Sequence, residues 1–544
     1  MSFAFHKFLG SGELFSIRGG VHPDDQKELS SGSAIEKMPL PNLLRIPLQQ
    51  HIGAPAEPIV AKDDIVRKGQ LLAVRRGSVS AAVHAPTSGR IIAIGRFAAP
   101  HPSGLPVATI TLRPDGEDLW DTLPEPLDLE RSTPDEIAER VDWAGIVGMG
   151  GATFPSSVKL NLRNRFELER LVINSAECEP YLTCDDRLLR ERSDDVADGI
   201  NFMARALGID DVVIAIESNK PAAIAAMKKA ADKILAKVQV IAVPTRYPTG
   251  SEKHLVQMLT GKETPARGLT ADIGIVVHNA ATAYAIHKAA RFGQPLISRI
   301  LTVSGRAIKR PANVEVLIGT PISDIIAHCG DLIGTPSRLL LGGPMMGQPI
   351  ANVRSPVIKG TNGILALSEG ETRRNEVMPC IRCGSCVNVC PSGLTPLELH
   401  ARIRNEELDG AVDIGLLDCI SCGSCSYACP SNIPLIQSFN YAKGKLTGQQ
   451  RTKHRQEETK RLAEQREERI ERLAAAKREA MARRKAEKAA KQKRETPEKA
   501  ADTAKKAPAP IDASARVATA AEPAAKDTLK SKTTATSPTV EAAE

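Results

Sequence analysis

The sequence has few aromatic residues and no long apolar run. Phe, Trp and Tyr together account for 3% of its 544 residues, too few for the stacking platforms that hold single-stranded nucleic acid. No stretch of about 18 uncharged apolar residues occurs, so we expect no membrane-spanning helix. The first ten residues also lack the apolar core of a signal peptide. We therefore expect no nucleic acid as a partner and no transmembrane segment of the chain's own.

Basic residues are unevenly distributed along the chain. The formal net charge is +8, but the excess of Lys and Arg falls within residues 451–494 and the remainder is close to balance. A uniformly basic chain would indicate nucleic-acid binding. A basic tail instead indicates a solvated segment that can meet an anionic partner.

Eight of the 11 cysteines lie between residues 380 and 429. This crowding argues against a disulfide framework and for a metal site in a reducing compartment. Two runs share the spacing C-x2-C-x2-C-x3-C-P, which is typical of bacterial two-cluster ferredoxins, where the fourth cysteine of each run ligates the other cluster. The predicted ligand sets are Cys380, Cys383, Cys386 and Cys429 for one [4Fe–4S] cluster, and Cys419, Cys422, Cys425 and Cys390 for the second [4Fe–4S] cluster.

A pair of zinc sites is the alternative interpretation of these cysteines. Zinc prefers two separated CxxC knuckles, whereas each run here places four cysteines within eleven residues and ends in proline. The spacing therefore favours iron–sulfur clusters and electron transfer. The other cysteines, Cys178, Cys184 and Cys329, have no ligand spacing.

Residues 143–305 alternate apolar runs with helical patterns. Runs such as LVINSAE and DVVIAIES predict buried strands, and the segments between them predict helices, so we expect a mostly parallel sheet covered by helices. Residues 35–112 and 300–350 instead predict short strands separated by turns. The other segments are predicted to be an irregular lead at 1–34, a linker at 121–135, an exposed charged helix at 446–495 and a disordered tail at 496–544.

A glycine-rich loop, GIVGMGGATFP, occupies residues 145–155. Gly148, Gly150 and Gly151 would let the backbone approach a phosphate, and a helix after the loop would offer its N-terminus. A structural turn is the alternative, because turns use glycine for many reasons.

Polar residues follow two of the predicted strands. The strand LVINSAE runs into Glu177 and Glu179, and carboxylates at a strand's end beside a phosphate loop suit the hydroxyl groups of a ribose or ribityl chain. Asn279 and Thr282 follow another strand at a predicted strand-to-helix turn. Together with the glycine loop, these residues indicate a nucleotide-binding site.

Several motifs taken together resemble the RnfC family, the C subunits of the Rnf/Rsx electron transport complex. They are spread over residues 1–440 and read GGVHP, HAPTSG, GGATFP, ECEPYLTCDDR, PTGSEKHL, VSGRAIKRPANVEVLIGTP and GGPMMG. The α/β part is also similar to the 51-kDa flavin- and NADH-binding subunit of respiratory complex I. One departure is Met149, which stands where the complex I loop has an arginine.

The resemblance implies a multidomain fold of α/β and α+β parts. Residues 35–115 would form a barrel sandwich of lipoyl or biotinyl type without a carrier lysine, because its hairpin reads Arg75-Arg76-Gly77-Ser78. The other implied domains are a Rossmann-like FMN/NADH domain at 136–299, a soluble ligand-binding β-grasp domain at 300–350 and a two-cluster ferredoxin module at 377–440.

The resemblance also implies noncovalent FMN and NADH as the substrate. FMN is needed because NADH gives up two electrons as hydride and a cluster takes one at a time. No catalytic residue is predicted. The implied cofactor-binding residues are Gly148, Gly150, Gly151, Phe154 and Lys159 in the glycine loop and after it, and Asn174, Glu177, Glu179, Asn279 and Thr282 as flavin or nicotinamide contacts.

For partners, the resemblance implies integral-membrane and cluster-bearing subunits of the complex, and ferredoxin. The chain would be a peripheral subunit on the cytoplasmic side of the bacterial inner membrane, with electron flow coupled to ion translocation. Two alternatives remain open at this point. One is a soluble diaphorase-type subunit built from the same modules, and the other is an electron relay that keeps a redox-sensing regulator reduced.

Overall fold

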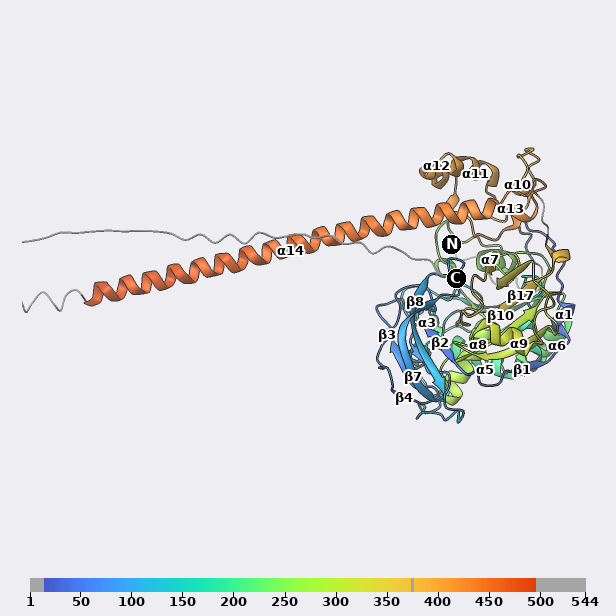
Figure 1. The fold of residues 1–544 in the computed structure, drawn as a ribbon, viewed down its shortest axis with the longest axis horizontal. Helices are drawn as coiled ribbons and strands as arrows, with labels where there is room; N and C mark the ends of the chain where they lie inside the picture. The colour runs from blue at the N-terminus through green and yellow to red at the C-terminus, as the bar shows by residue number, and fades with distance from the viewer. Residues whose placement is uncertain (1–13, 373–375, 496–544) are drawn as a thin grey trace, which may run out of the picture. The chain divides into compact units, whose positions relative to one another are not determined.

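The computed structural model describes residues 14–372 and 376–495 (Figure 1). The predictions for the first 13 residues and for the tail at 496–544 lie outside the described residues. The chain divides into two compact units, with the boundary between Arg451 and Thr452. Within the described ranges, no helix combines the length and apolar character that a membrane span requires.

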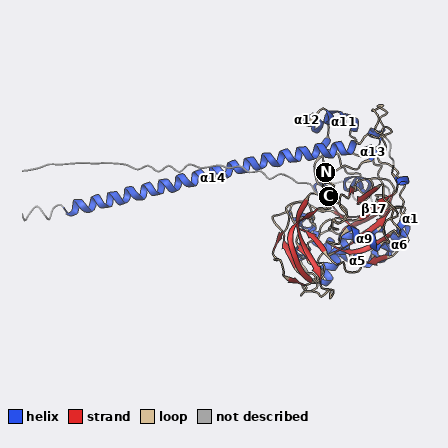
Figure 2. Cartoon of the chain, viewed as in Figure 1, coloured by secondary structure: helices blue, strands red, loops and turns tan. Residues whose placement is uncertain are grey.

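Two small antiparallel sheets form the N-terminal domain. Figure 2 draws their strands in red, as it does every strand. One has the strand order β2-β8-β7-β4 and the other β3-β5-β6. Leu44, Leu72 and Ile110 are among the apolar side chains of these sheets that are fully buried in one core. The strands are β2 (Leu44–Pro47), β3 (Glu57–Pro58), β4 (Ile65–Val66), β5 (Leu71–Val74), β6 (Val83–His84), β7 (Gly89–Ala98) and β8 (Pro106–Pro114).

The predicted parallel sheet is present. Its strands are β9 (Arg170–Ser175), β10 (Asp211–Glu217), β11 (Lys237–Val243) and β12 (Ile275–Asn279). All pair in parallel in the order β11-β10-β9-β12. The chain therefore adds β10 and β11 on one side of β9 and then places β12 on the other side of β9. In such sheets ligands bind beyond the carboxyl ends of the strands at the point where the order reverses, which here lies between β9 and β12.

Helices cover this sheet because their apolar faces need burial. α5 and α8 pack closely, and Gly199 of α5 allows it, since a Cβ there would lie 1.9 Å from the carbonyl oxygen of Ala283. Thr133 and Glu136 form a capping box at the start of α2. The helices are α2 (Pro134–Trp143), α3 (Ser156–Leu160), α4 (Cys184–Glu191), α5 (Ser193–Leu207), α6 (Pro221–Ala230), α7 (Glu252–Thr260) and α8 (Ala280–Phe292), and the 3-10 turns are η1 (Asn161–Asn164), η2 (Ala231–Lys233) and η3 (Thr270–Ile273).

A fourth, mixed sheet has the order β1-β14-β13-β17-β15-β16. Its β1 lies within the range predicted for the barrel sandwich but pairs in parallel with β14, and β17 lies beyond the predicted end of the β-grasp domain. Strand pairing is decided by backbone contacts between distant segments. The sequences of these short strands do not indicate which segment each of them pairs with. The elements are α1 (Glu28–Ser31), β1 (Ile35–Lys37), β13 (Ser298–Ser304), β14 (Ala312–Leu317), α9 (Ile322–His328), β15 (Arg338–Leu341), β16 (Gln348–Pro349), β17 (Gly363–Leu367) and η4 (Glu369–Glu371).

Short helices and loops form the ferredoxin module around its own apolar core. Leu399, Leu435, Phe439 and Ala442 are among its buried residues. The elements are α10 (Ser385–Asn388), α11 (Pro396–Arg404), α12 (Leu408–Asp413), η5 (Leu416–Asp418), α13 (Ser424–Tyr427) and the start of α14 (Leu435–Glu495).

α14 begins at Leu435, well before residue 446, where the charged helix was predicted to start. The reason is a short apolar face: Leu435, Phe439 and Ala442 lie at helical spacing and are buried in the module. From residue 447 to 492 every side chain is exposed. Within this stretch Lys460–Glu464 and Arg483–Glu487 form i,i+4 ion pairs, which support an exposed helix.

Candidate functional site

The glycine loop meets the end of β12 at the predicted crevice. The Oγ1 of Thr282 accepts a hydrogen bond from the backbone N–H of Met149 over 3.0 Å. A Cβ on Gly150 would lie 3.3 Å from the Cβ of Asn279. Gly150 is therefore a neighbour of Asn279 and Thr282 in the fold, although these two residues lie more than a hundred positions later in the sequence.

Two asparagine amides join the strands at this crevice. The side-chain Oδ1 of Asn279 caps α8 by accepting from Ala281 N–H over 2.9 Å, and its Nδ2 donates to Asp185 over 2.6 Å. Asn174, at the end of β9, donates from Nδ2 to the carbonyl oxygen of Gly250 over 2.8 Å. Gly250 belongs to the PTGSEKHL motif, so this contact brings that motif to the same place.

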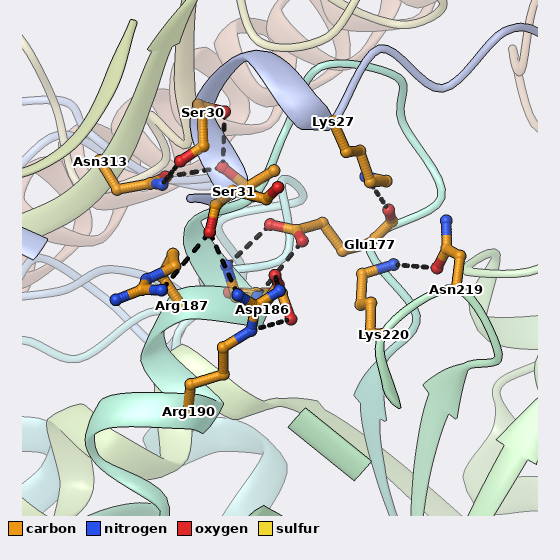
Figure 3. A network of polar contacts seen from close by, with 12 residues as sticks. Lys27, Ser30, Ser31, Glu177, Asp186, Arg187, Arg190, Asn219, Lys220 and Asn313 are labelled. Atoms are coloured by element: carbon orange, nitrogen blue, oxygen red, sulfur yellow. Dashed lines mark hydrogen bonds and ion pairs between the residues drawn. The ribbon is translucent and has the colours of Figure 1, made fainter. Parts of the chain in front are cut away.

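Glu177 holds the first turn of α4. Its carboxylate accepts hydrogen bonds from the backbone N–H groups of Asp185 over 2.7 Å and Asp186 over 3.3 Å, a favourable position for a negative charge. Its backbone has φ +51°, a conformation that non-glycine residues adopt at a cost and that concentrates at functional sites. Figure 3 shows Glu177 between Lys27 and α4.

Lys27 was not predicted as a site residue, although it lies shortly after the GGVHP motif. Its Nζ donates to the carbonyl oxygens of Glu177 over 2.9 Å, Glu179 over 3.1 Å and Leu182 over 2.6 Å. Burial lowers the pKa of Lys27, and the positive charge of Lys220 lowers it further. The three bonds hold the segment from 177 to 182 in one conformation.

Glu179 ties the same segment to the GGPMMG motif. Its carboxylate accepts from the backbone N–H groups of Met345 over 3.0 Å and Met346 over 2.8 Å. Gly343 must be glycine here, since a Cβ would lie 2.2 Å from the Glu179 carboxylate. Burial raises the pKa of Glu179 to about 7. Both predicted glutamates thus have backbone partners within the protein.

A cavity of about 240 Å³ lies beside this segment, at the ends of β9, β10 and β11. Behind it, Lys220 and Glu217 form a buried ion pair of 3.0 Å, each 1% exposed. Lys220 also donates to the carbonyl oxygen of Ala176 over 2.8 Å. The ion pair therefore holds the backbone directly before Glu177. The residues that line the cavity include Lys27, Cys178, Glu217, Asn219, Arg246 and Tyr247.

The rest of the glycine loop is partly open to solvent. Gly150 and Gly151 are exposed, Gly148 and Phe154 are half-buried, and Gly151 has φ +113°, which favours glycine. Lys159 donates from Nζ to Val277 O over 2.9 Å and pairs with Glu252 over 3.1 Å. The helix predicted after the loop is shorter than expected. α3 has only five residues, so it offers little of the aligned dipole of a longer helix.

Arg299 of β13 is a second residue that the sequence did not reveal. Its side chain is 2% exposed and donates to Thr361 O over 3.0 Å and to Met149 O in the glycine loop over 3.3 Å. Its remaining Nη1 is buried without a protein partner in the described residues. Its charge acts on Cys184 and Asp185, which with Glu177 form a group of ligand-type atoms within 4.8 Å of one another. A buried guanidinium beside that group opposes a cation there.

The crevice has the groups that a phosphorylated flavin needs. An exposed glycine loop permits close approach, Lys159 and Arg299 supply positive charge, and Asn174 and Asn279 supply amides. The Nη1 of Arg299, a side chain that also contacts Met149 of the loop, is a donor without a hydrogen-bond partner among the described residues. The residues present therefore fit FMN.

The two cysteine runs fold into nearly identical loops. Arg382 and Ser421 have φ of 56° and 57°, and Gly384 and Gly423 have φ of 77° and 79°. In each loop a backbone N–H points to the first sulfur: Arg382 N–H to Cys380 Sγ and Ser421 N–H to Cys419 Sγ, both at 3.4 Å. Such N–H groups stabilise thiolate ligands of iron.

The sulfurs come together across the runs. Burial raises the pKa of Cys386, and Cys429 and Cys380 are the nearby thiols that raise it further. Burial likewise raises the pKa of Cys425 to about 12, with Cys422, Cys419 and Cys390 as the contributing thiols. Both thiols therefore have neighbours from the other cysteine run, and the crossed assignment of the ligands stays a prediction.

Four family models match the chain. A Nuo51 FMN-binding domain matches residues 141–288, and an RnfC barrel sandwich hybrid domain matches residues 15–117. A 4Fe-4S dicluster domain matches residues 379–433, and an SLBB domain matches residues 300–349. These are the barrel-sandwich, flavin, SLBB and iron–sulfur parts that the sequence motifs predicted.

Relatives of high identity cover most of the chain. The C subunit of an ion-translocating oxidoreductase complex from Rhodobacter capsulatus is 64% identical over 442 residues, which is 81% of this chain and 85% of the relative. The C subunit of a proton-translocating ferredoxin:NAD(+) oxidoreductase complex from Clostridium ljungdahlii is 44% identical, and the match covers 70% of this chain and 83% of the relative.

A solved structure of an NAD+-reducing nickel–iron hydrogenase in its H2-reduced state is similar over part of the fold. It is 18% identical, with a TM-score of 0.42, and covers 62% of this chain and 72% of that chain.

Proposed function

Because this chain belongs to the RnfC family, the C subunits of ion-translocating oxidoreductase complexes, we propose that it oxidises NADH and passes the electrons through FMN and two [4Fe–4S] clusters to its partners. As a member of that family with an FMN-binding domain and a 4Fe-4S dicluster domain, it is an electron-transfer subunit of an oxidoreductase complex. NADH as the donor and the number of clusters belong to the proposal.

The observation that carries the proposal is the meeting of the glycine loop with β12. Met149 N–H binds Thr282, and Gly150 lies against Asn279 at the point where the strand order reverses. A nucleotide or flavin phosphate is the ligand that such a crevice suits. FMN, when bound, accepts an electron pair as hydride and releases single electrons.

Each predicted residue has a role in this proposal. Gly148, Gly150 and Gly151 leave room for the bound group, Lys159 offers it a positive charge, and Phe154 offers an apolar edge. Glu177 and Glu179 act by holding the backbone of their segment against it. Asn174, Asn279 and Thr282 fix the two strand ends that form the crevice.

The cysteines are proposed to hold the clusters in the crossed pattern. Cys380, Cys383, Cys386 and Cys429 would bind one, and Cys419, Cys422, Cys425 and Cys390 the other. The support is the proximity of Cys386 to Cys429 and of Cys425 to Cys390.

We further propose that integral-membrane subunits couple this electron transfer to ion translocation. Ferredoxin would be the redox partner that exchanges electrons with NADH through the complex. The chain would be a peripheral subunit on the cytoplasmic side of the bacterial inner membrane, where NADH is found. The names of the relatives support this: one belongs to an ion-translocating complex and another to a ferredoxin:NAD(+) oxidoreductase complex.

Anaerobic purification with measurement of FMN, iron and NADH-driven bleaching tests the proposal. Gly150→Asp should abolish FMN binding and NADH oxidation while both clusters stay reducible by dithionite, because it adds bulk and negative charge beside Asn279. Gly95→Asp is the matched control, since no atom lies within 4 Å of a Cβ there.

Three results would redirect the proposal. A Gly150→Asp protein with normal FMN and activity would return the loop to a structural turn. NADH oxidation in a protein that never associates with membranes would favour a soluble diaphorase-type subunit, and a protein without FMN would favour an electron relay that keeps a regulator reduced.

A further inference from the structure

The two cysteine sets have different surroundings, although their loops match. We call Cys390, Cys419, Cys422 and Cys425 the inner set and Cys380, Cys383, Cys386 and Cys429 the outer set. In the inner set, Cys390, Cys422 and Cys425 are 9%, 8% and 8% exposed. In the outer set, Cys380 and Cys383 are exposed and no member is buried.

Tyr247 connects the inner set to the cavity beside residues 177–182, which we call the flavin segment. It follows β11, is 2% exposed, and donates from its hydroxyl to the carbonyl oxygen of Cys422 over 2.7 Å. Its ring lies in an apolar cluster with Val21 and Cys422, and Cys178 of the flavin segment packs against that cluster. Tyr247 and Cys178 also line the cavity of about 240 Å³.

Met345 forms a second connection. Its N–H donates to Glu179 in the flavin segment over 3.0 Å. Its carbonyl oxygen faces the inner loop so closely that a Cβ on Gly423 would lie 2.9 Å from it. The GGPMMG motif therefore contacts the flavin segment on one side and the inner loop on the other.

The equivalent glycine of the outer loop has no such neighbour. Gly384 has the same backbone conformation as Gly423, but a Cβ there would have no atom within 4 Å in the described part of the chain. Around this open loop, Ile381, Val377 and Met378 are 68%, 62% and 55% exposed. Grouped apolar side chains at a surface mark an interaction site, and here they flank exposed cluster ligands.

We propose that the two clusters work in a fixed order. The inner set holds the cluster that exchanges electrons with the flavin site, and the outer set holds the cluster that exchanges them with an iron–sulfur protein docked over Val377, Met378 and Ile381. This order rests on the proposed function. Electrons move quickly between two protein-bound clusters only when the clusters approach closely. The exposed sulfurs of the outer set would allow the cluster of an iron–sulfur partner to approach in this way.

The electrons balance over one turnover. One NADH gives up two electrons and one proton and becomes NAD+. The two electrons cross the inner and outer sites one at a time, and the iron–sulfur partner takes one electron in each of two reductions. The same route serves the reverse direction, in which reduced partner supplies two electrons for one NAD+.

Variants that lack one cluster test the order in the full-length protein. Both clusters are first reduced with dithionite, the excess is removed, and NAD+ is added while paramagnetic resonance follows each signal. In Cys380→Ala/Cys383→Ala the inner signal should disappear at the wild-type rate. In Cys419→Ala/Cys425→Ala the outer signal should persist, with re-oxidation slowed at least a hundredfold. Rapid loss of the outer signal in the second variant would overturn the order.

A measurement on the unmodified protein keeps the test independent of cluster stability. A dysprosium chelate in solution speeds the relaxation of paramagnetic centres near the surface. The outer signal should relax faster than the inner one, and equal effects on both would overturn the assignment. If NAD+ re-oxidises neither cluster in the wild type, the proposed function fails, whereas the relaxation result still decides which cluster faces solvent.

The docking surface is tested in membranes that contain the complete complex. Ile381→Asp should slow electron transfer from reduced ferredoxin to NAD+ at least tenfold and leave NADH:ferricyanide activity unchanged. Leu235→Asp, at an apolar side chain that is 77% exposed elsewhere, should change neither. Unchanged ferredoxin-dependent activity in Ile381→Asp would overturn the proposed docking surface. The proposal would also fail if the purified protein were a dimer and Ile381→Asp converted it to a monomer, because a second copy of the chain would then occupy this surface.

Discussion

The ferredoxin module and the flavin crevice assemble their sites in different ways. In the module, eight cysteines that we propose as ligands lie within fifty residues, and two loops with φ angles that agree within two degrees present them. In the crevice, the groups come from residues 27 to 346 and reach one another only through tertiary contacts. The comparison teaches that a site built on local spacing can be recognised in a sequence, whereas a site built on strand order and loop contacts needs the structure.

The strongest test of this comparison is the crossed ligand pattern. Cys390→Ser should remove about half of the iron and abolish the signal of the cluster held by Cys419, Cys422 and Cys425, although Cys390 belongs to the first run. Cys383→Ser should abolish the other signal. Paramagnetic resonance of the two reduced variants measures this, and loss of the same signal in both would show that each run binds its own cluster.

A large effect on the crevice is expected from Lys27→Met. The change removes three hydrogen bonds to carbonyl oxygens of the flavin segment, so stability should fall by about 3 kcal/mol and FMN should be lost more readily. Urea unfolding and FMN content measure the two effects. Lys233→Met is the control, since its ion pair with Asp194 is mostly exposed. Equal losses in both variants would mean that Lys27 has no special role.

A smaller effect is expected from the pH dependence at Glu179. Burial raises its pKa from 4.5 to about 7, so the folded state holds a proton that the unfolded state releases. Its contribution to stability is therefore full below pH 4.5 and is lost as the pH rises to 7, by on the order of 1–3 kcal/mol. Glu179→Gln should flatten the unfolding free energy over that range. An unchanged slope would show that Glu179 does not cause it.

The smallest effect is expected at the charged helix. Truncation after Leu446 was the natural cut from the sequence, but Leu446 still packs on the ferredoxin core. A cut after Arg451, at the boundary of the two units, should leave iron, FMN and NADH:ferricyanide activity unchanged. Salt should weaken any membrane attachment that the basic segment provides. Loss of flavin or clusters would show that the helix supports the catalytic unit.

Much of the fold could be predicted because its signals are local. Apolar runs predicted the parallel sheet, and the family models match the barrel-sandwich, FMN, SLBB and dicluster parts. β1 and the start of α14 were harder. β1 has only three residues and pairs with a strand almost three hundred residues away, and α14 gains its first turns from packing rather than from its own charge pattern.

The sequence by itself determined the chemistry of this protein: thiolates at ferredoxin spacing and a glycine loop before an acidic strand end. Tertiary structure decided how these parts are arranged. It placed Lys27 against the flavin segment and Arg299 against the glycine loop, and it used the carboxylates of Glu177 and Glu179 to bind backbone N–H groups. It also buried the cysteine loop of the inner set and left the matching loop of the outer set exposed to solvent. The physical reason is that ligand spacing is a property of neighbouring residues, whereas burial is a property of whatever the fold packs around them.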